Sequence, residues 1–118
     1  MKTPEQITNS LVKEFDKLND IREQSLKLSR EIIKSCSKSI RNVHRNNLDE
    51  AKQHLDEANK NYQDLRSSLK DIPELRFAGY VNDSERELIE AFLVFEFEKT
   101  NSLLEFEGMN VSASNYIQ

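Results

Sequence analysis

The 118-residue sequence has no tryptophan, two glycines, two prolines and one cysteine. So few glycines and prolines leave little to interrupt a helix, and 32% charged residues complete the profile of a helical, water-soluble domain. Because Cys36 is alone, an internal disulfide is excluded, which fits a reducing compartment. One cysteine and two histidines ten residues apart also exclude a zinc-ligand cluster of the usual kind.

Long apolar runs are missing as well. The longest, Ala91 to Phe95, has five residues, far fewer than a membrane-spanning helix needs. The first ten residues are polar and lack the apolar centre of a signal peptide. We therefore expect a single cytoplasmic domain with no membrane partner.

A very long first helix is predicted over about residues 4–45. Thr3 and Pro4 form an N-cap followed by proline at the first helical position. Nothing breaks the pattern before Asn46, so the helix is about 40 residues and ~60 Å long. Apolar residues recur through it at helical spacing, with Ser25 in the one vacant position: Ile7, Leu11, Phe15, Leu18, Ile21, Leu28, Ile32, Cys36, Ile40 and Val43.

Two further helices are predicted, over about residues 48–70 and 83–107. The second helix begins after Asn47 and ends before Pro73, and the third is capped by Asn82 or Asp83. Residues 72–80 form a corner between them in which Gly79 permits a positive φ, and residues 109–118 lead into a further, truncated helix. The expected fold class is an all-α, long-helix antiparallel bundle.

The helix lengths do not match. Two helices of ~35 Å each, lying alongside one another, cannot cover a first helix of ~60 Å. We therefore expect parts of the first-helix stripe, together with Leu103, Leu104 and Phe106, to be exposed. This predicts either the N-terminal part of a longer helical protein or an obligate oligomer.

The net charge of −4 is unevenly distributed, and residues 22–45 carry seven basic and two acidic groups. Six of the basic residues are spaced 3, 4, 4, 3 and 4 apart, which places them on one helix face opposite the apolar stripe. Such a row suits a phosphate backbone, although a solvated helix face remains the simpler interpretation. We call these residues the basic row: Lys27, Arg30, Lys34, Lys38, Arg41 and Arg45.

A pair of carboxylates, Glu87 and Glu90, lies one helical turn apart at the start of a strongly apolar segment. Eight of the ten residues from Leu88 to Phe97 are apolar, which predicts a buried central helix. Carboxylates in such a helix need a partner, and a cation is one candidate. The alternatives are solvated acids at a helix N-terminus, or ion pairs with Arg30 or Arg76.

Several short runs resemble the translin and translin-associated factor X family, most closely its archaeal and factor X-like branch. The similarity covers roughly residues 20–118, and the runs occur in the same order and spacing as in the family. They are Leu28-Ser29-Arg30-Glu31-Ile32-Ile33, Ser39-Ile40-Arg41, Val43-His44-Arg45, Ala78-Gly79-Tyr80, Arg86-Glu87-Leu88-Ile89-Glu90-Ala91 and Lys99-Thr100-Asn101-Ser102-Leu103.

This resemblance implies the N-terminal part of an all-α protein that forms hollow homo-oligomers, often octamers, and binds single-stranded RNA or DNA. In the factor X-like branch it also implies a Mg²⁺-dependent endoribonuclease, with Mn²⁺ as an alternative. Glu87 and Glu90 match two acids of that catalytic and metal site, and the other ligands come from a later helix that this chain does not contain. A non-catalytic nucleic-acid-binding subunit and a helical protein-interaction module are the competing interpretations.

Overall fold

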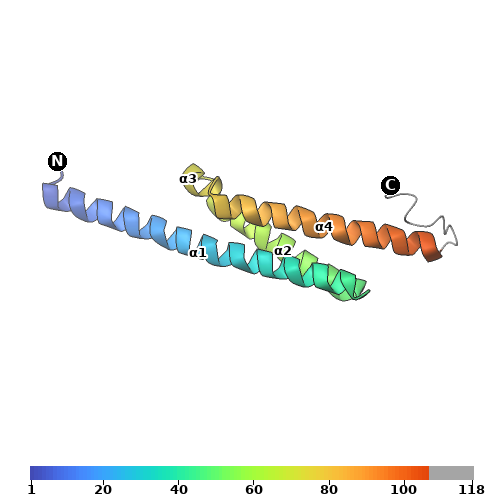
Figure 1. Ribbon diagram of the computed structural model, residues 1–118. Helices are drawn as coiled ribbons and strands as arrows, with labels where there is room; N and C mark the ends of the chain where they lie inside the picture. The colour runs from blue at the N-terminus through green and yellow to red at the C-terminus, as the bar shows by residue number, and fades with distance from the viewer. Residues whose placement is uncertain (107–118) are drawn as a thin grey trace.

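The computed structural model describes residues 1–106, and the side chains of residues 1–101. This part of the chain is built from helices, with no β-strand, so the predicted all-α class is confirmed. The helices are α1 (Pro4–His44), α2 (Leu48–Leu69), the short α3 (Pro73–Arg76) and α4 (Gly79–Phe106). In Figure 1, α2 runs antiparallel to α1, and α4 runs beside them in the direction of α1. No helix among the described residues is both long and apolar enough to cross a membrane.

The first helix is unbroken, as predicted. The Thr3 side chain accepts a hydrogen bond from the Gln6 backbone N–H, and the Gln6 side chain accepts one from the Thr3 N–H. This capping box satisfies two N–H groups that would otherwise lack partners in the first turn. At the other end the chain turns at Asn46, whose φ of 61° lies in the left-handed region that asparagine tolerates better than most residues.

Small polar side chains lie on the buried face of α1. Four serines of α1 are buried, Ser25, Ser29, Ser35 and Ser39, where a hydrophobic stripe would be expected to carry larger residues. At Ser39 the helices α1 and α2 lie close together, because the Ser39 hydroxyl donates a 2.8 Å hydrogen bond to the backbone carbonyl of Ala51. From the sequence, only Ser25 was assigned to this face.

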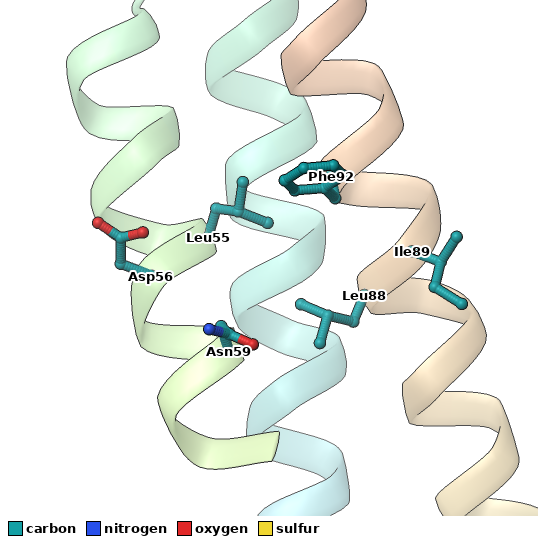
Figure 2. Close-up of a pocket in the computed structure, with 6 residues that line it drawn as sticks. All are labelled: Leu55, Asp56, Asn59, Leu88, Ile89 and Phe92. Atoms are coloured by element: carbon teal, nitrogen blue, oxygen red, sulfur yellow. The ribbon is translucent and has the colours of Figure 1, made fainter. Parts of the chain in front are cut away.

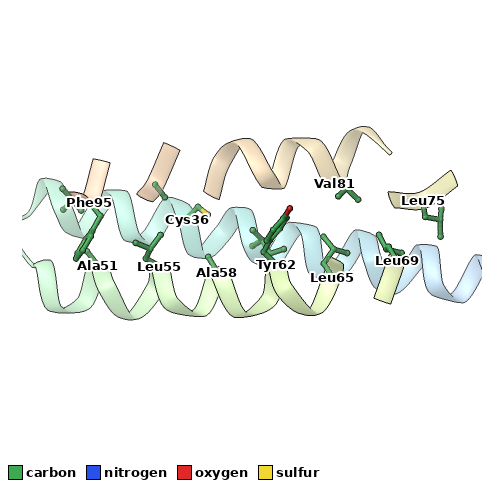
Figure 3. Close-up of a cluster of buried hydrophobic side chains, with 13 residues drawn as sticks. Cys36, Ala51, Leu55, Ala58, Tyr62, Leu65, Leu69, Leu75, Val81 and Phe95 are labelled. Carbon is green, nitrogen blue, oxygen red and sulfur yellow. The ribbon is translucent and has the colours of Figure 1, made fainter. Parts of the chain in front are cut away.

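The hydrophobic core runs along α1 and α2 and is covered by α3 and α4 (Figure 3). Most of its side chains are small or aliphatic, and Phe95 and Tyr62 are its two aromatic members. The buried hydrophobic residues are Ile32, Cys36, Val43, Ala51, Leu55, Ala58, Tyr62, Leu65, Leu69, Leu75, Val81, Ala91 and Phe95.

The predicted start of the third long helix was wrong by about four residues. Asn82 and Asp83 lie inside α4, which begins at Gly79, and the backbone N–H groups of Val81 and Asn82 donate to the carbonyl of Ala78. The hydrogen bonds of α4 therefore start at the Ala78 carbonyl, upstream of both candidate caps. Gly79 has no positive φ, so the conformational freedom that glycine permits in this corner is not used.

The interpretation of α4 as a buried central helix was also wrong for the described chain. Ala91 and Phe95 are buried against α1 and α2, but the opposite face of α4 is exposed. Ile89, Leu93 and Phe97 are each more than half exposed on that face. Two neighbouring helices can cover only one side of α4, and its apolar composition reflects both sides.

The molecule is elongated, with principal extents of 78 × 25 × 16 Å. The N-terminal half of α1 projects beyond the other helices (Figure 1). Ile7, Leu11, Phe15 and Leu18 are exposed there, which confirms that part of the first-helix stripe is uncovered. We call residues 4–20 the arm. The prediction for Leu103, Leu104 and Phe106 lies outside the described side chains.

Candidate nucleic-acid interface and acidic pair

The basic row occupies the solvent face of α1. Five of its six side chains are exposed and Lys38 is half-buried. The opposite face of the same helix carries Ile32, Cys36 and Val43, all buried in the core. Five members of the row, from Lys27 to Arg41, lie along one side of α1, and Arg45 follows at the C-cap of the helix. From Lys27 to Arg45 the row is about 27 Å long at 1.5 Å per residue.

The charges of the row are not neutralised by neighbouring acids. Within the part of the chain that the structure describes, none of its six members forms an ion pair. Only Glu23 and Glu31 carry negative charge in the same stretch of α1. A run of uncompensated cations on a low-dielectric support attracts polyanions even when the protein as a whole is slightly acidic.

The two carboxylates of the acidic pair differ in their surroundings. Glu87 is half-buried, whereas Glu90 is exposed. The Glu87 charge also acts on the thiol of Cys36, so Glu87 lies on the side of α4 that faces α1. Arg76 pairs with Glu85, and neither Glu87 nor Glu90 forms an ion pair among the described side chains.

The acidic pair has two carboxylates and no further ligand from the described residues. In that part of the chain no group of three or more His, Cys, Asp or Glu side chains is close enough to hold a metal ion. Mg²⁺ is often held in proteins by one or two carboxylates, with water and substrate phosphates completing its coordination. A magnesium site that used this pair would need its remaining ligands from outside the described residues.

Cys36 is a buried core residue whose thiol resists ionisation. Burial raises its pKa from 9.0 to about 11, and the negative charge of Glu87 adds to this effect. A thiol with so high a pKa is almost entirely protonated at neutral pH and is a poor nucleophile. The interpretation of Cys36 as a core residue, rather than a reactive one, follows from both properties.

A polar network that was not predicted from the sequence connects α2, α3 and α4. The Tyr62 hydroxyl donates a 2.5 Å hydrogen bond to the Glu85 carboxylate, which also lies 3.1 Å from the Arg76 guanidinium. Burial raises the pKa of Tyr62, and the hydrogen bond to Glu85 raises it further. The network holds helices together and contains none of the predicted site residues. In the sequence, the only indication of this network was a tyrosine, Tyr62, among the apolar positions of the second helix.

A groove between α2 and α4 lies away from the basic row but borders the acidic pair, because Leu88 and Ile89, which line it, stand between Glu87 and Glu90 in the sequence. Figure 2 shows Leu55, Leu88 and Phe92 along it, with the polar ends of Asp56 and Asn59 on the α2 side. Its walls are mainly apolar, and the charged atoms it presents come from an acid. Such a groove suits an apolar side chain or helix rather than a phosphate strand.

Comparison with known proteins gives a relative but no family. The chain is 32% identical over 111 residues to an uncharacterized protein of the archaeon Methanocaldococcus jannaschii. The match covers 92% of this chain and 49% of the relative, so the chain spans about half the length of the curated protein it resembles. No protein-family model matches the chain, and no solved structure matches it either.

Proposed function

We propose that this protein binds single-stranded RNA or DNA through the basic row of α1. The observation that carries the proposal is the exposure of these cations along one helix face, without ion pairs among the described residues. Binding of this kind is driven by the release of counterions from the phosphates and requires no enclosed pocket. The resemblance to the translin family supports the same activity.

The straight shape of the row favours a single strand over a duplex. Each strand of a duplex winds around the helix axis, so its phosphates leave a straight protein helix after a short distance. A flexible single strand can follow the row over its whole length of about 27 Å. The described chain offers no evident platform of aromatic residues beside the row, so we expect weak discrimination between bases.

The proposal predicts a strong dependence of affinity on salt. If all six basic residues contact phosphates, the slope of log K against log salt for a single strand should be about −4. Reversing the charge of Lys34, Lys38 and Arg41 should reduce the magnitude of this slope by about 0.7 for each phosphate that is no longer neutralised. Fluorescence anisotropy with a labelled, unstructured oligonucleotide at low and at moderate salt measures both quantities.

A matched control changes the same net charge elsewhere. Lys13, Lys60 and Lys70 are exposed and lie outside the row, so their reversal should change the slope much less. Equal effects of the two triple variants would assign the affinity to net charge and not to the row. Absence of binding by the wild-type chain at low salt would favour the helical interaction module instead.

Endoribonuclease activity is a finer proposal that concerns a longer protein. Glu87 and Glu90 would supply two ligands for Mg²⁺ or Mn²⁺, and further acids would have to complete the site. A bound ion of this kind activates water and neutralises charge on a phosphodiester. The row would hold the strand, and the family resemblance would extend to the homo-oligomers, octamers among them, that its members form. If a longer chain binds strands but does not cleave them, the protein is a non-catalytic binding subunit.

A further inference from the structure

We propose that the arm of α1 pairs antiparallel with the arm of a second copy of this chain. The contact would be a short two-helix coiled coil, related by a two-fold axis near Phe15. This proposal is independent of nucleic-acid binding, because it uses the apolar face of residues 4–20 and the basic row starts at Lys27 on the opposite face.

The arm has an apolar stripe and, within the described chain, nothing to cover it. Leu11 is 61% exposed and Phe15 is 69% exposed, among the highest values of the large hydrophobic residues. The contacts of α1 with α2 begin near Ile21 and Ser25, which line a groove with Asp64 and Ser68. Residues before this point therefore form a helix with one apolar side in water, a feature that marks an interaction surface.

The positions of the apolar residues suit self-pairing. Leu11 and Leu18 are seven residues apart, which is one full repeat of a coiled coil. In an antiparallel pair with its axis near Phe15, Leu11 of one copy faces Leu18 of the other, and this contact occurs twice. In this register the two Phe15 residues, and Ile7 and Ile21, are each offset by one residue, or about 1.5 Å along the axis, so their side chains lie side by side without being directly opposite.

The orientation follows from the place of the core. The stripe of the arm continues directly into the face of α1 that α2 and α4 cover, between Ser25 and Val43. In a parallel pair, both sets of covering helices would compete for the same space between the two α1 helices. An antiparallel pair sets the two bundles at opposite ends, so they do not collide.

The area available is enough for a dimer of modest affinity. Five exposed side chains form the surface: Ile7, Leu11, Val12, Phe15 and Leu18. If all of this exposed surface became buried, two arms would bury on the order of 1,000 Å² in total, which lies just below the range for stable specific interfaces. We therefore expect a weak dimer that is populated only at high protein concentration.

Disulfide formation tests both the pairing and its direction. Leu11→Cys and Leu18→Cys chains are prepared separately, with Cys36 retained because it is buried. A mixture should give the mixed disulfide between the two variants under mild oxidation, whereas each variant alone should give little. A parallel pair would reverse this outcome, since each variant would then cross-link to itself, and that result would overturn the proposal. Non-reducing gels and mass spectrometry identify the products.

Sedimentation analysis tests the surface without a cross-link. Phe15→Glu should leave the circular dichroism spectrum of the bundle largely intact and lower dimer affinity at least tenfold. Lys13→Glu, on the polar side of the arm, should have little effect. If the wild type remains monomeric at several hundred micromolar, the proposal fails, and the stripe would be assigned to additional chain of the length that the relative has. Strand binding by the Phe15→Glu monomer would persist, so the two proposals fail separately.

Discussion

At the scale of single residues, the Glu85 carboxylate connects three helices. It accepts from Tyr62 on α2 and pairs with Arg76, which ends α3, while belonging itself to α4. Hydrogen bonds to charged groups contribute more to stability than neutral ones, particularly where the groups are partly shielded from water. This network fixes the corner from which α4 starts, and so the position of the acidic pair that begins two residues further along.

Removing the Tyr62 hydroxyl should therefore destabilise the fold. We expect Tyr62→Phe to lower the free energy of unfolding by about 1–2 kcal/mol, as measured by urea denaturation. Tyr80→Phe is a matched control, because the Tyr80 hydroxyl is buried with no hydrogen-bond partner within the described structure. Its removal should be neutral or slightly stabilising. Equal losses in the two variants would show that the network with Glu85 contributes nothing specific.

Cys36 gives the protein a pH dependence in the alkaline range. Its thiol ionises at pH 9.0 in the unfolded chain but only at about 11 in the folded one, because burial raises its pKa. The unfolded state thus loses its proton first, and stability falls as pH rises from about 9 to 11. The loss is on the order of 2 kcal/mol once both states are ionised.

The measurement compares wild type with Cys36→Ala, because tyrosines and lysines also titrate in this range. Wild type should exceed the variant by a constant margin up to pH 9, and the margin should shrink between pH 9 and 11. Two unfolding curves that stay parallel over this range would contradict the assigned pKa. Glu87→Gln should shift the fall to slightly lower pH, since it removes the second cause of the raised pKa.

Residue-level features were predictable to different degrees. The exposure of the basic row follows from its spacing, because six charged residues opposite an apolar stripe have only one arrangement on a helix. The two partners of Glu85 could not be predicted from the sequence. Tyr62, Arg76 and Glu85 belong to three different helices, and only the packing of those helices brings them together. The buried serines of α1 were missed for a related reason: serine is usually a surface residue, and only close helix packing makes it a core one.

At the scale of elements, α4 carries two different surfaces. One contains Ala91 and Phe95 and is buried, and the other contains Ile89, Leu93 and Phe97 and is exposed. The apolar sequence of α4 alone predicted burial on all sides. How much of the helix is buried depends on how many other helices pack against it. The start of α4 was also predicted too far along the chain, because its hydrogen bonds begin at the Ala78 carbonyl. By contrast, α1 was predicted almost to its ends, because its cap and stripe are both local signals.

The acidic pair on α4 is tested by removing its charge at constant shape. The test uses a longer chain that contains the additional acidic ligands. In it, the double variant Glu87→Gln, Glu90→Gln should reduce Mg²⁺-dependent RNA cleavage, because an amide binds a hard dication less well than a carboxylate does. Strand affinity should stay the same or rise slightly. In the 118-residue chain, EDTA should leave strand binding unchanged, since the basic row needs no metal.

The control for this pair is Glu50→Gln with Glu57→Gln, two exposed acids of α2. It changes the net charge equally and should leave cleavage unaffected. Wild-type cleavage in the Glu87/Glu90 double variant would make these carboxylates structural. Abolition of strand binding by EDTA would move the metal from the proposed site to the binding surface.

At the scale of the whole molecule, the chain is far from compact. Its radius of gyration is 21.0 Å, whereas a compact domain of this length would have about 13–14 Å. The exposed faces of the arm and of α4 lie on different parts of this rod, and the archaeal relative has roughly as many residues again outside the matched region. In a longer chain of this kind, the additional residues decide which of the two exposed faces stays in contact with solvent.

The projecting arm also makes the local stability of the molecule uneven along its length. An isolated helix of about 20 residues is only marginally stable in water, and nothing in the described chain packs on the arm to stabilise it. Its amides should therefore exchange with deuterium within seconds to minutes, while those around Ile32 and Leu65 exchange only with global unfolding. Protection that spreads into the arm as protein concentration rises would report, amide by amide, that a partner helix has arrived.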